Sequence, residues 1–111
     1  SMVISGDKNS KRANYETVAE MTVNCLKEIC PNDLGGIAFL SGGQSNDEAT
    51  NHLRIMNSGD FDLPWRVTFS YARAIQQSAL NKWSGKDENH DEAQAILSER
   101  AKNCSDASVG N

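Results

Sequence analysis

Two short segments of the chain carry residues that could bind an anion. The first is the segment 40–45, with the sequence LSGGQS, which lies between an apolar run and a helical pattern. Glycine lets backbone N–H groups approach an anion closely, and the N-terminal end of a helix favours negative charge. Phosphate is therefore the natural ligand, although a plain strand-to-helix turn explains the two glycines equally well.

The second segment is 70–73, with the sequence SYAR, in the equivalent place after the next apolar run. The planar guanidinium of Arg73 suits phosphate oxygens, and the backbone N–H of Ala72 lies at a strand-to-helix turn. Arg73 alone could equally make an ordinary surface or interface salt bridge. Because the ends of neighbouring parallel strands meet at one rim, the pairing of the two segments favours phosphate.

Other chemistry has little support in the residue pattern. We interpret His52 and His90 as surface histidines, because neither has a carboxylate or cysteine at metal-ligand spacing. The three cysteines are odd in number and form no CxxC motif, which favours structural thiols in a reducing compartment. No P-loop, GxGxxG motif or Ser-His-Asp order is present. The chain itself therefore supplies an anion cradle, with no evident nucleophile or base.

Length and charge exclude several classes of protein. The chain has 111 residues, 38% of them hydrophobic, and a formal net charge of −4, which describes at most one ordinary domain. No run approaches the roughly eighteen apolar residues that would span a bilayer. The acidic balance counts against a nucleic-acid surface. We expect neither a membrane nor a nucleic acid as partner.

Hydrophobic periodicity predicts four helices and two strands. Helices are expected over 14–29, 46–56, 72–83 and 88–104, and strands over 37–40 and 67–71. The first of these strands, 37–40, is continuously apolar, which predicts a strand covered on both faces, as in a parallel sheet. A further strand could end at residues 2–4, and we expect Trp65 and Trp83 to be packing residues. Residues 105–111 are small and polar, so we expect the start of a flexible tail.

The order of elements is typical of an α/β protein with a parallel sheet. Two parallel strands cannot form a whole fold, because both edges stay open and the apolar helix faces need more sheet to cover. The pattern therefore predicts part of a larger α/β barrel or doubly wound domain. We expect the segment not to fold stably alone.

Longer motifs extend over nearly the whole chain, and they resemble the class I fructose-bisphosphate aldolases, the Schiff-base-forming (β/α)₈ barrels. The similar stretches are 36–45 (GIAFLSGGQS), 64–65 (PW), 69–74 (FSYARA), 78–80 (SAL) with Trp83, 85–86 (GK), 88–89 (EN) and the opening residues 1–3 (SMV). One departure is Ala72, where many members of the family have glycine. A backbone N–H donor survives that change.

The resemblance implies that residues 1–111 are the C-terminal part of a single (β/α)₈, or TIM, barrel domain, with its last two strands, their helices and the C-terminal helix. The family's catalytic lysine would lie just upstream of Ser1, so no catalytic residue is expected in this segment. No metal and no cofactor are implied. The implied substrate phosphate-binding positions are Ser41, Gly42, Ala72 and Arg73, with Gly43, Ser70 and Tyr71 as neighbours.

The implied function is glycolytic cleavage of fructose 1,6-bisphosphate to dihydroxyacetone phosphate and glyceraldehyde 3-phosphate, in reversible Schiff-base chemistry. The implied partners are a phosphorylated sugar, the remainder of the aldolase chain and further copies in a cytoplasmic homotetramer. The alternative is a non-enzymatic fragment that binds phosphate or another protein.

Overall fold

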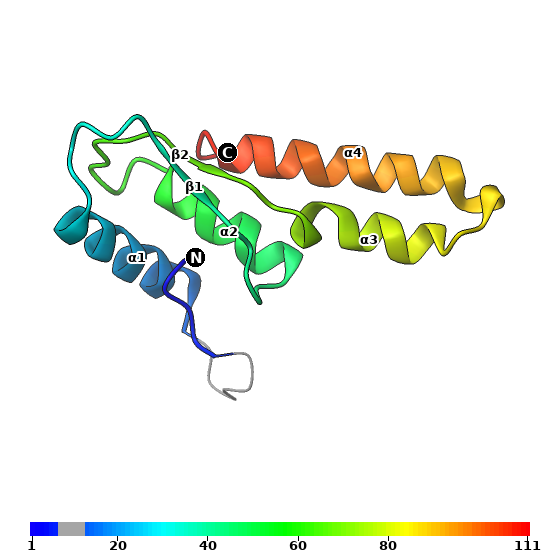
Figure 1. Ribbon diagram of the computed structural model, residues 1–111, viewed down its shortest axis with the longest axis horizontal. Helices are drawn as coiled ribbons and strands as arrows, with labels where there is room; N and C mark the ends of the chain where they lie inside the picture. Colours follow the sequence, from blue (N-terminus) through cyan, green and yellow to red (C-terminus); the bar gives the residue numbers. More distant parts are fainter. Residues whose placement is uncertain (7–12) are drawn as a thin grey trace.

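The computed structural model describes residues 1–6 and 13–111 of the chain. Figure 1 shows the elements in chain order. They are α1 (Tyr15–Ile29), β1 (Ile37–Phe39), α2 (Asn46–Met56), β2 (Val67–Phe69), α3 (Arg73–Trp83), the short 3₁₀ helix η1 (Asp87–Asn89) and α4 (His90–Ala107). The four predicted helices and the two strands predicted over 37–40 and 67–71 are all present, and the strands are shorter than predicted. The protein is therefore an α/β structure, as the pattern predicted.

The two strands form a parallel pair, with Ile37 opposite Val67 and Phe39 opposite Phe69. Both strands consequently end at the same edge of the sheet, so the segments 40–45 and 70–73 leave it side by side. One face of the sheet is packed, with Phe39 and Val67 buried. The other face is exposed at Ala38, Leu40 and Thr68. Within the described residues, the strand predicted over 37–40 is therefore covered on one face only, because their helices pack against that face.

Local capping fixes the start of the first two helices. The Asn14 side chain accepts a hydrogen bond from the Thr17 N–H at 2.8 Å at the start of α1. Ser45 and Glu48 form a reciprocal capping box at the start of α2. Both caps were predicted from the sequence, because a polar side chain before an apolar helical stripe satisfies N–H groups that have no partner within the helix.

Helix α2 is the centre of the packing. It lies between α1 and the antiparallel pair of α3 and α4, which run side by side (Figure 1). Ala49, Leu53 and Met56 on α2 are each 1% exposed or less. The helix is thereby held from both sides.

The remaining predictions needed three corrections. Residues 2–4 are not a strand: Met2 is buried, and the Val3 N–H donates to the Thr22 hydroxyl on α1 at 3.0 Å. Helix α4 extends to Ala107, past the predicted end, because Ala107 is fully buried and anchors the last turn. The apolar stripe of α1 is also only partly buried, with Ile29 73% exposed. Among residues 1–6 and 13–111, no helix is both long and apolar enough to cross a membrane.

Candidate anion-binding site

A shallow hollow of about 550 Å³ lies where the first turns of α2 and α3 meet. Gly43, from the first predicted segment, and Arg73, from the second, both line it. The Asn46 side-chain amide donates to the Ser78 hydroxyl at 2.8 Å and joins the two helices at this point. The structure therefore brings the two predicted segments together around one open space. The other lining residues are Gln44, Ser45, Asn46, Asp47, Gln77, Ser78 and Asn81.

The loop between β1 and α2, residues 40–45, turns on two consecutive glycines and is called the glycine loop. Gly42 and Gly43 have φ values of 34° and 80°, in the left-handed region that favours glycine. The Gln44 N–H closes the turn by donating to the Ser41 carbonyl at 3.0 Å. The N–H groups of Gly42 and Gly43 donate to no atom of the described residues. Two backbone donors are therefore available to a ligand, as an anion cradle requires.

The start of α3 has the clearest anion-binding features. Ala72 provides no side-chain cap, and no acidic residue lies in the first turn. In the described part of the chain, the N–H groups of Ala72 and Arg73 find no acceptor. The Arg73 side chain is exposed, and it makes no ion pair or hydrogen bond with a described residue. Positive helix-terminal charge and a free guanidinium thus coincide.

Helix α2 contributes less to anion binding than the sequence suggested. Its N-terminus is already occupied by its own capping box, and Asp47 and Glu48 add negative charge in its first turn. These carboxylates offset the positive end of the helix dipole. The favourable groups are therefore the two glycine N–H groups before α2 and the first turn of α3.

Of the seven predicted positions, only Gly43 and Arg73 line the hollow. Gly42 and Ala72 precede them in the chain, and the other three support the loops. Ser41 is buried, and its carbonyl accepts hydrogen bonds from Gln44. The Tyr71 side chain is buried, and its hydroxyl donates to the Ala49 carbonyl at 3.0 Å. Burial, with a smaller Coulombic effect of Cys104, raises the pKa of Tyr71. Ser70 is exposed, but its N–H is used on the Phe39 carbonyl at 2.8 Å.

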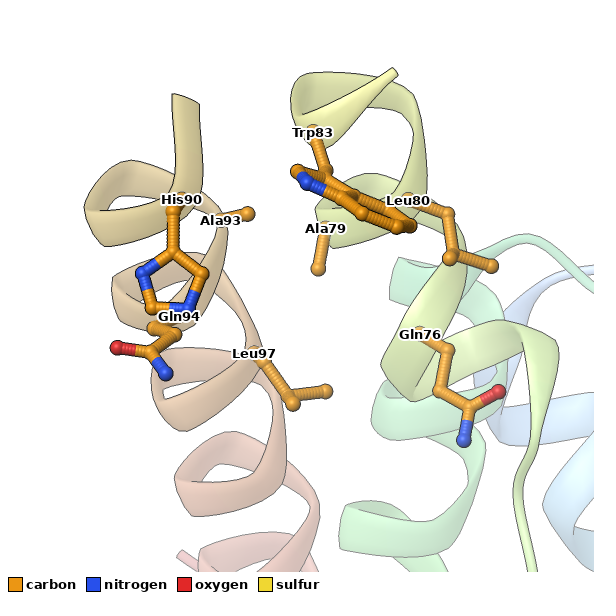
Figure 2. Close-up of a pocket in the computed structure, with 8 residues that line it drawn as sticks. All are labelled: Gln76, Ala79, Leu80, Trp83, His90, Ala93, Gln94 and Leu97. Atoms are coloured by element: carbon orange, nitrogen blue, oxygen red, sulfur yellow. The ribbon is translucent and has the colours of Figure 1, made fainter. Parts of the chain in front are cut away.

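A second hollow, a groove of about 380 Å³, lies between the outer halves of α3 and α4 (Figure 2). Leu80 and Trp83 on α3 face it together with Leu97 on α4, and Trp83 is 43% exposed. Trp83 is thus less well packed than expected, whereas Trp65 is buried and donates to the Pro31 carbonyl at 2.6 Å. The groove is lined by apolar, amide and imidazole groups, so it does not compete with the first hollow for an anion.

One residue behind the glycine loop was misjudged from the sequence. His52 was predicted to lie at the surface, yet it is 2% exposed. Its Nδ1 lies 2.5 Å from the side-chain oxygen of Gln44. The signal was its spacing: His52 follows Ala49 by three residues and precedes Met56 by four, so it shares the buried face of α2. Among the cysteines, Cys25 is exposed, Cys30 is half-buried, Cys104 is buried, and all three are free thiols.

Comparison with known proteins identifies the family. A family model described as fructose-bisphosphate aldolase class-I matches residues 1–111. The chain belongs to this family. The resemblance inferred from the motifs is therefore confirmed. The glycine loop and Arg73 both lie in this aldolase segment.

Curated aldolases match the segment over almost its full length. The chain is 44% identical over 108 residues to the cytoplasmic fructose-bisphosphate aldolase isozyme of Spinacia oleracea, covering 97% of this chain and 30% of that protein. It is 50% identical to a probable class 1 aldolase of Xanthomonas campestris, covering 99% of this chain and 33% of that protein. The chain therefore spans about a third of the length of these aldolases.

A solved aldolase has the same arrangement of elements. The structure is that of fructose-bisphosphate aldolase from Plasmodium falciparum, in a ternary complex with TRAP and a small-molecule inhibitor. It matches with a TM-score of 0.90 and 41% sequence identity, covering 98% of this chain and 31% of that one. The helices and strands of the aldolase segment thus agree with those of an experimental aldolase structure.

Proposed function

We propose that this segment is the C-terminal part of a class I fructose-bisphosphate aldolase and supplies the site that holds a phosphate of the substrate. The observation that carries the proposal is the hollow between α2 and α3. There an exposed arginine without a described partner lies at an uncapped helix N-terminus and shares the hollow with Gly43, whose N–H, like that of Gly42 before it, has no described acceptor. These groups all favour an anion, and the relatives named above are aldolases.

Each residue has a stated role in this proposal. Arg73 and the N–H groups of Ala72, Gly42 and Gly43 bind the phosphate, while Ser41 closes the glycine turn. Ser70 and Tyr71 place α3 at the end of β2. The catalytic lysine that forms the Schiff base lies in the part of the enzyme before this segment, and the reaction needs neither a metal nor a cofactor.

The phosphate site serves the reaction by orienting the substrate. Fructose 1,6-bisphosphate reacts through its ketose carbon, whose iminium with lysine accepts electrons when the carbon–carbon bond breaks. Binding energy from the remote phosphate holds that carbon against the lysine. This positioning lowers the entropic contribution to the activation free energy. The products are dihydroxyacetone phosphate and glyceraldehyde 3-phosphate.

The same proposal places the segment in a (β/α)₈ barrel, with β1 and β2 as the seventh and eighth strands. The exposed sheet face at Ala38, Leu40 and Thr68 then faces the barrel interior, and the loops after the strands lie at the rim where barrel enzymes bind phosphate. We also place the enzyme in the cytoplasm, as a homotetramer. The name of the Spinacia oleracea relative, a cytoplasmic isozyme, supports the location.

The deciding experiment is an aldol-cleavage assay of the full-length protein that carries this segment. We expect cleavage of fructose 1,6-bisphosphate that resists a metal chelator and is lost when borohydride is added with the substrate, because reduction traps the Schiff base. Cleavage that the chelator abolishes, or an absence of both cleavage and trapped adduct, would contradict the proposal. The second result would leave a non-enzymatic anion-binding segment.

A further inference from the structure

We propose that His52 is a positioning residue for the glycine loop, acting through the side-chain amide of Gln44. The inference rests on the proposed function only in so far as the ligand of the loop is a phosphate. Neither side chain lies among the groups that bind the anion in that proposal. Gln44 belongs to the loop and lines the hollow, and His52 lies behind it in the core of the segment.

The Gln44 amide joins two parts of the structure. Its nitrogen donates to the Ser41 carbonyl at 2.9 Å, and its oxygen lies 2.5 Å from His52 Nδ1. A carbonyl can only accept, so the Ser41 contact fixes which end of the amide is the nitrogen. The amide oxygen therefore faces the imidazole, and His52 Nδ1 must carry the proton and donate it. The contact between Gln44 and His52 therefore defines which ring nitrogen of His52 carries the proton.

His52 is itself held firmly. It is 2% exposed on the central helix α2, and the ring of Tyr15 on α1 packs against it edge-on, with 5.1 Å between centroids and an interplanar angle of 81°. Such T-shaped pairs fix ring orientation. The packing of α1 on α2 thus fixes the His52 ring, and the hydrogen bond from His52 in turn fixes the Gln44 side chain.

The glycine loop needs such support. Gly42 and Gly43 have the greatest backbone freedom of any residue type, and their free N–H groups bind one anion together only while the turn keeps its shape. Gln44 ties the start of this turn, Ser41, through its backbone N–H and its side chain. Anchoring Gln44 to His52 keeps the turn closed before the ligand arrives, which spares the entropic cost of ordering it on binding.

The test measures phosphate affinity in the full-length protein, with inorganic phosphate as the probe in isothermal titration calorimetry. We compare His52→Leu, which removes the donor, with His52→Asn, whose side-chain nitrogen is bonded to Cγ as His Nδ1 is and keeps the donor in place. We expect the leucine variant to bind phosphate about tenfold more weakly and the asparagine variant to stay within about twofold of wild type. His90→Leu, the same change at an exposed histidine on α4, is the matched control.

A double-mutant cycle separates positioning from general stability. If His52 acts through Gln44, then His52→Leu weakens phosphate binding no further in a Gln44→Ala background. Equal losses in the leucine and asparagine variants, unchanged affinity in both, or additive losses in the cycle would each overturn the proposal. If His52→Leu does not fold, His52→Asn is compared with Gln44→Ala instead. The proposal then requires phosphate affinity near wild type in His52→Asn and about tenfold weaker binding in Gln44→Ala.

The assay of substrate cleavage in the same proteins keeps the two proposals distinct. A wild-type protein that binds phosphate but does not cleave fructose 1,6-bisphosphate refutes the aldolase function and leaves the role of His52 testable by calorimetry. An active enzyme whose phosphate affinity is the same in wild type and in the His52 variants refutes the positioning role alone. Where both hold, we expect His52→Leu to raise KM for fructose 1,6-bisphosphate more than it lowers kcat.

Discussion

At the scale of single residues, Arg73 contributes the one exposed guanidinium of the proposed phosphate site. We expect Arg73→Ala in the full-length enzyme to lower kcat/KM for fructose 1,6-bisphosphate by about 10- to 100-fold, because a charge-assisted contact to phosphate is lost. The fold should stay intact, since the side chain makes no contact with described residues that an alanine would leave unpaired. Steady-state kinetics with circular dichroism measures both effects.

The matched control for Arg73 is on the same helix. Lys82 is an exposed cation near the end of α3, and it pairs with Glu92 at 2.7 Å. Because exposed pairs contribute little to stability and Lys82 is outside the hollow, Lys82→Ala should leave kcat/KM within about twofold. Unchanged kinetics in Arg73→Ala, or an equal loss in both variants, would remove Arg73 from the site.

Tyr71 is the residue whose role changes most between sequence and structure. Tyr71→Phe should lower the free energy of unfolding by about 1 kcal/mol at neutral pH, because the hydrogen bond from the buried hydroxyl to the Ala49 carbonyl is lost. The KM for fructose 1,6-bisphosphate should stay within about twofold, since the hydroxyl points into the core. A large rise in KM with unchanged stability would instead return Tyr71 to the phosphate site.

The raised pKa of Tyr71 adds a pH dependence with a definite sign. Above about pH 10 the unfolded tyrosine loses its proton, while burial keeps the folded one protonated. The folded state then binds more protons than the unfolded state, so stability falls as pH rises. Phenylalanine cannot ionise, so the stability gap between wild type and Tyr71→Phe should shrink from about pH 9 to about pH 11. Urea unfolding at a series of pH values measures this gap, and a constant gap would contradict the burial of the hydroxyl.

At the scale of elements, Arg100 on α4 ties together the two helices that begin at the hollow. It is 9% exposed, its Nε donates to the Ala74 carbonyl on α3 at 3.0 Å, and its Nη2 donates to the Asn46 carbonyl on α2 at 3.1 Å. The same Nη2 also donates to the Thr50 hydroxyl at 2.7 Å. One side chain therefore sets how the first turns of α2 and α3 lie against each other.

Arg100→Met should test this link between helices. We expect the full-length protein to lose about 2–4 kcal/mol of unfolding free energy, because three hydrogen bonds from a buried guanidinium to α2 and α3 are lost, and its KM for fructose 1,6-bisphosphate to rise. Arg54→Met, the same change at an exposed arginine on α2, should cost less than about 0.5 kcal/mol. Urea unfolding and steady-state kinetics measure the two effects. Similar stability in the two variants would show that α4 does not hold the helices together.

The same scale explains what could be predicted from the sequence. The capping residues Asn14 and Ser45, and the change from apolar runs to helical stripes, are local features, so element order and the adjacent loops were correct. Arg100 reaches α2 and α3 across 54 and 26 positions of sequence, and no local pattern encodes such a contact. The prediction that His52 lies at the surface was wrong because it followed residue type, although the helical spacing of His52 with Ala49 and Met56 indicates burial. The buried position of the Tyr71 side chain depends on a contact with Ala49, 22 positions away, which no local pattern encodes.

At the scale of the whole molecule, the segment exposes surface that an α/β barrel would cover. Its sheet has two strands of three residues, and each strand has one edge without a partner in the described chain. Leu40 is 57% exposed on the open face of the sheet, and Leu80 is 50% exposed beside the groove between α3 and α4. A parallel sheet is normally covered on both faces, and so small a sheet with open edges has little independent stability.

We therefore expect residues 1–111, expressed alone, to unfold gradually in urea and to bind a hydrophobic dye, whereas the full-length enzyme unfolds cooperatively and binds little dye. Adding the separately produced N-terminal part of the enzyme should reduce dye binding by the segment and restore cleavage of fructose 1,6-bisphosphate, because it covers the open sheet face and supplies the lysine. The Arg73→Ala segment is the control for that mixture: it should reduce dye binding equally and restore much less activity. Cooperative unfolding of the isolated segment, with little dye bound, would mean that its helices alone stabilise the exposed strands.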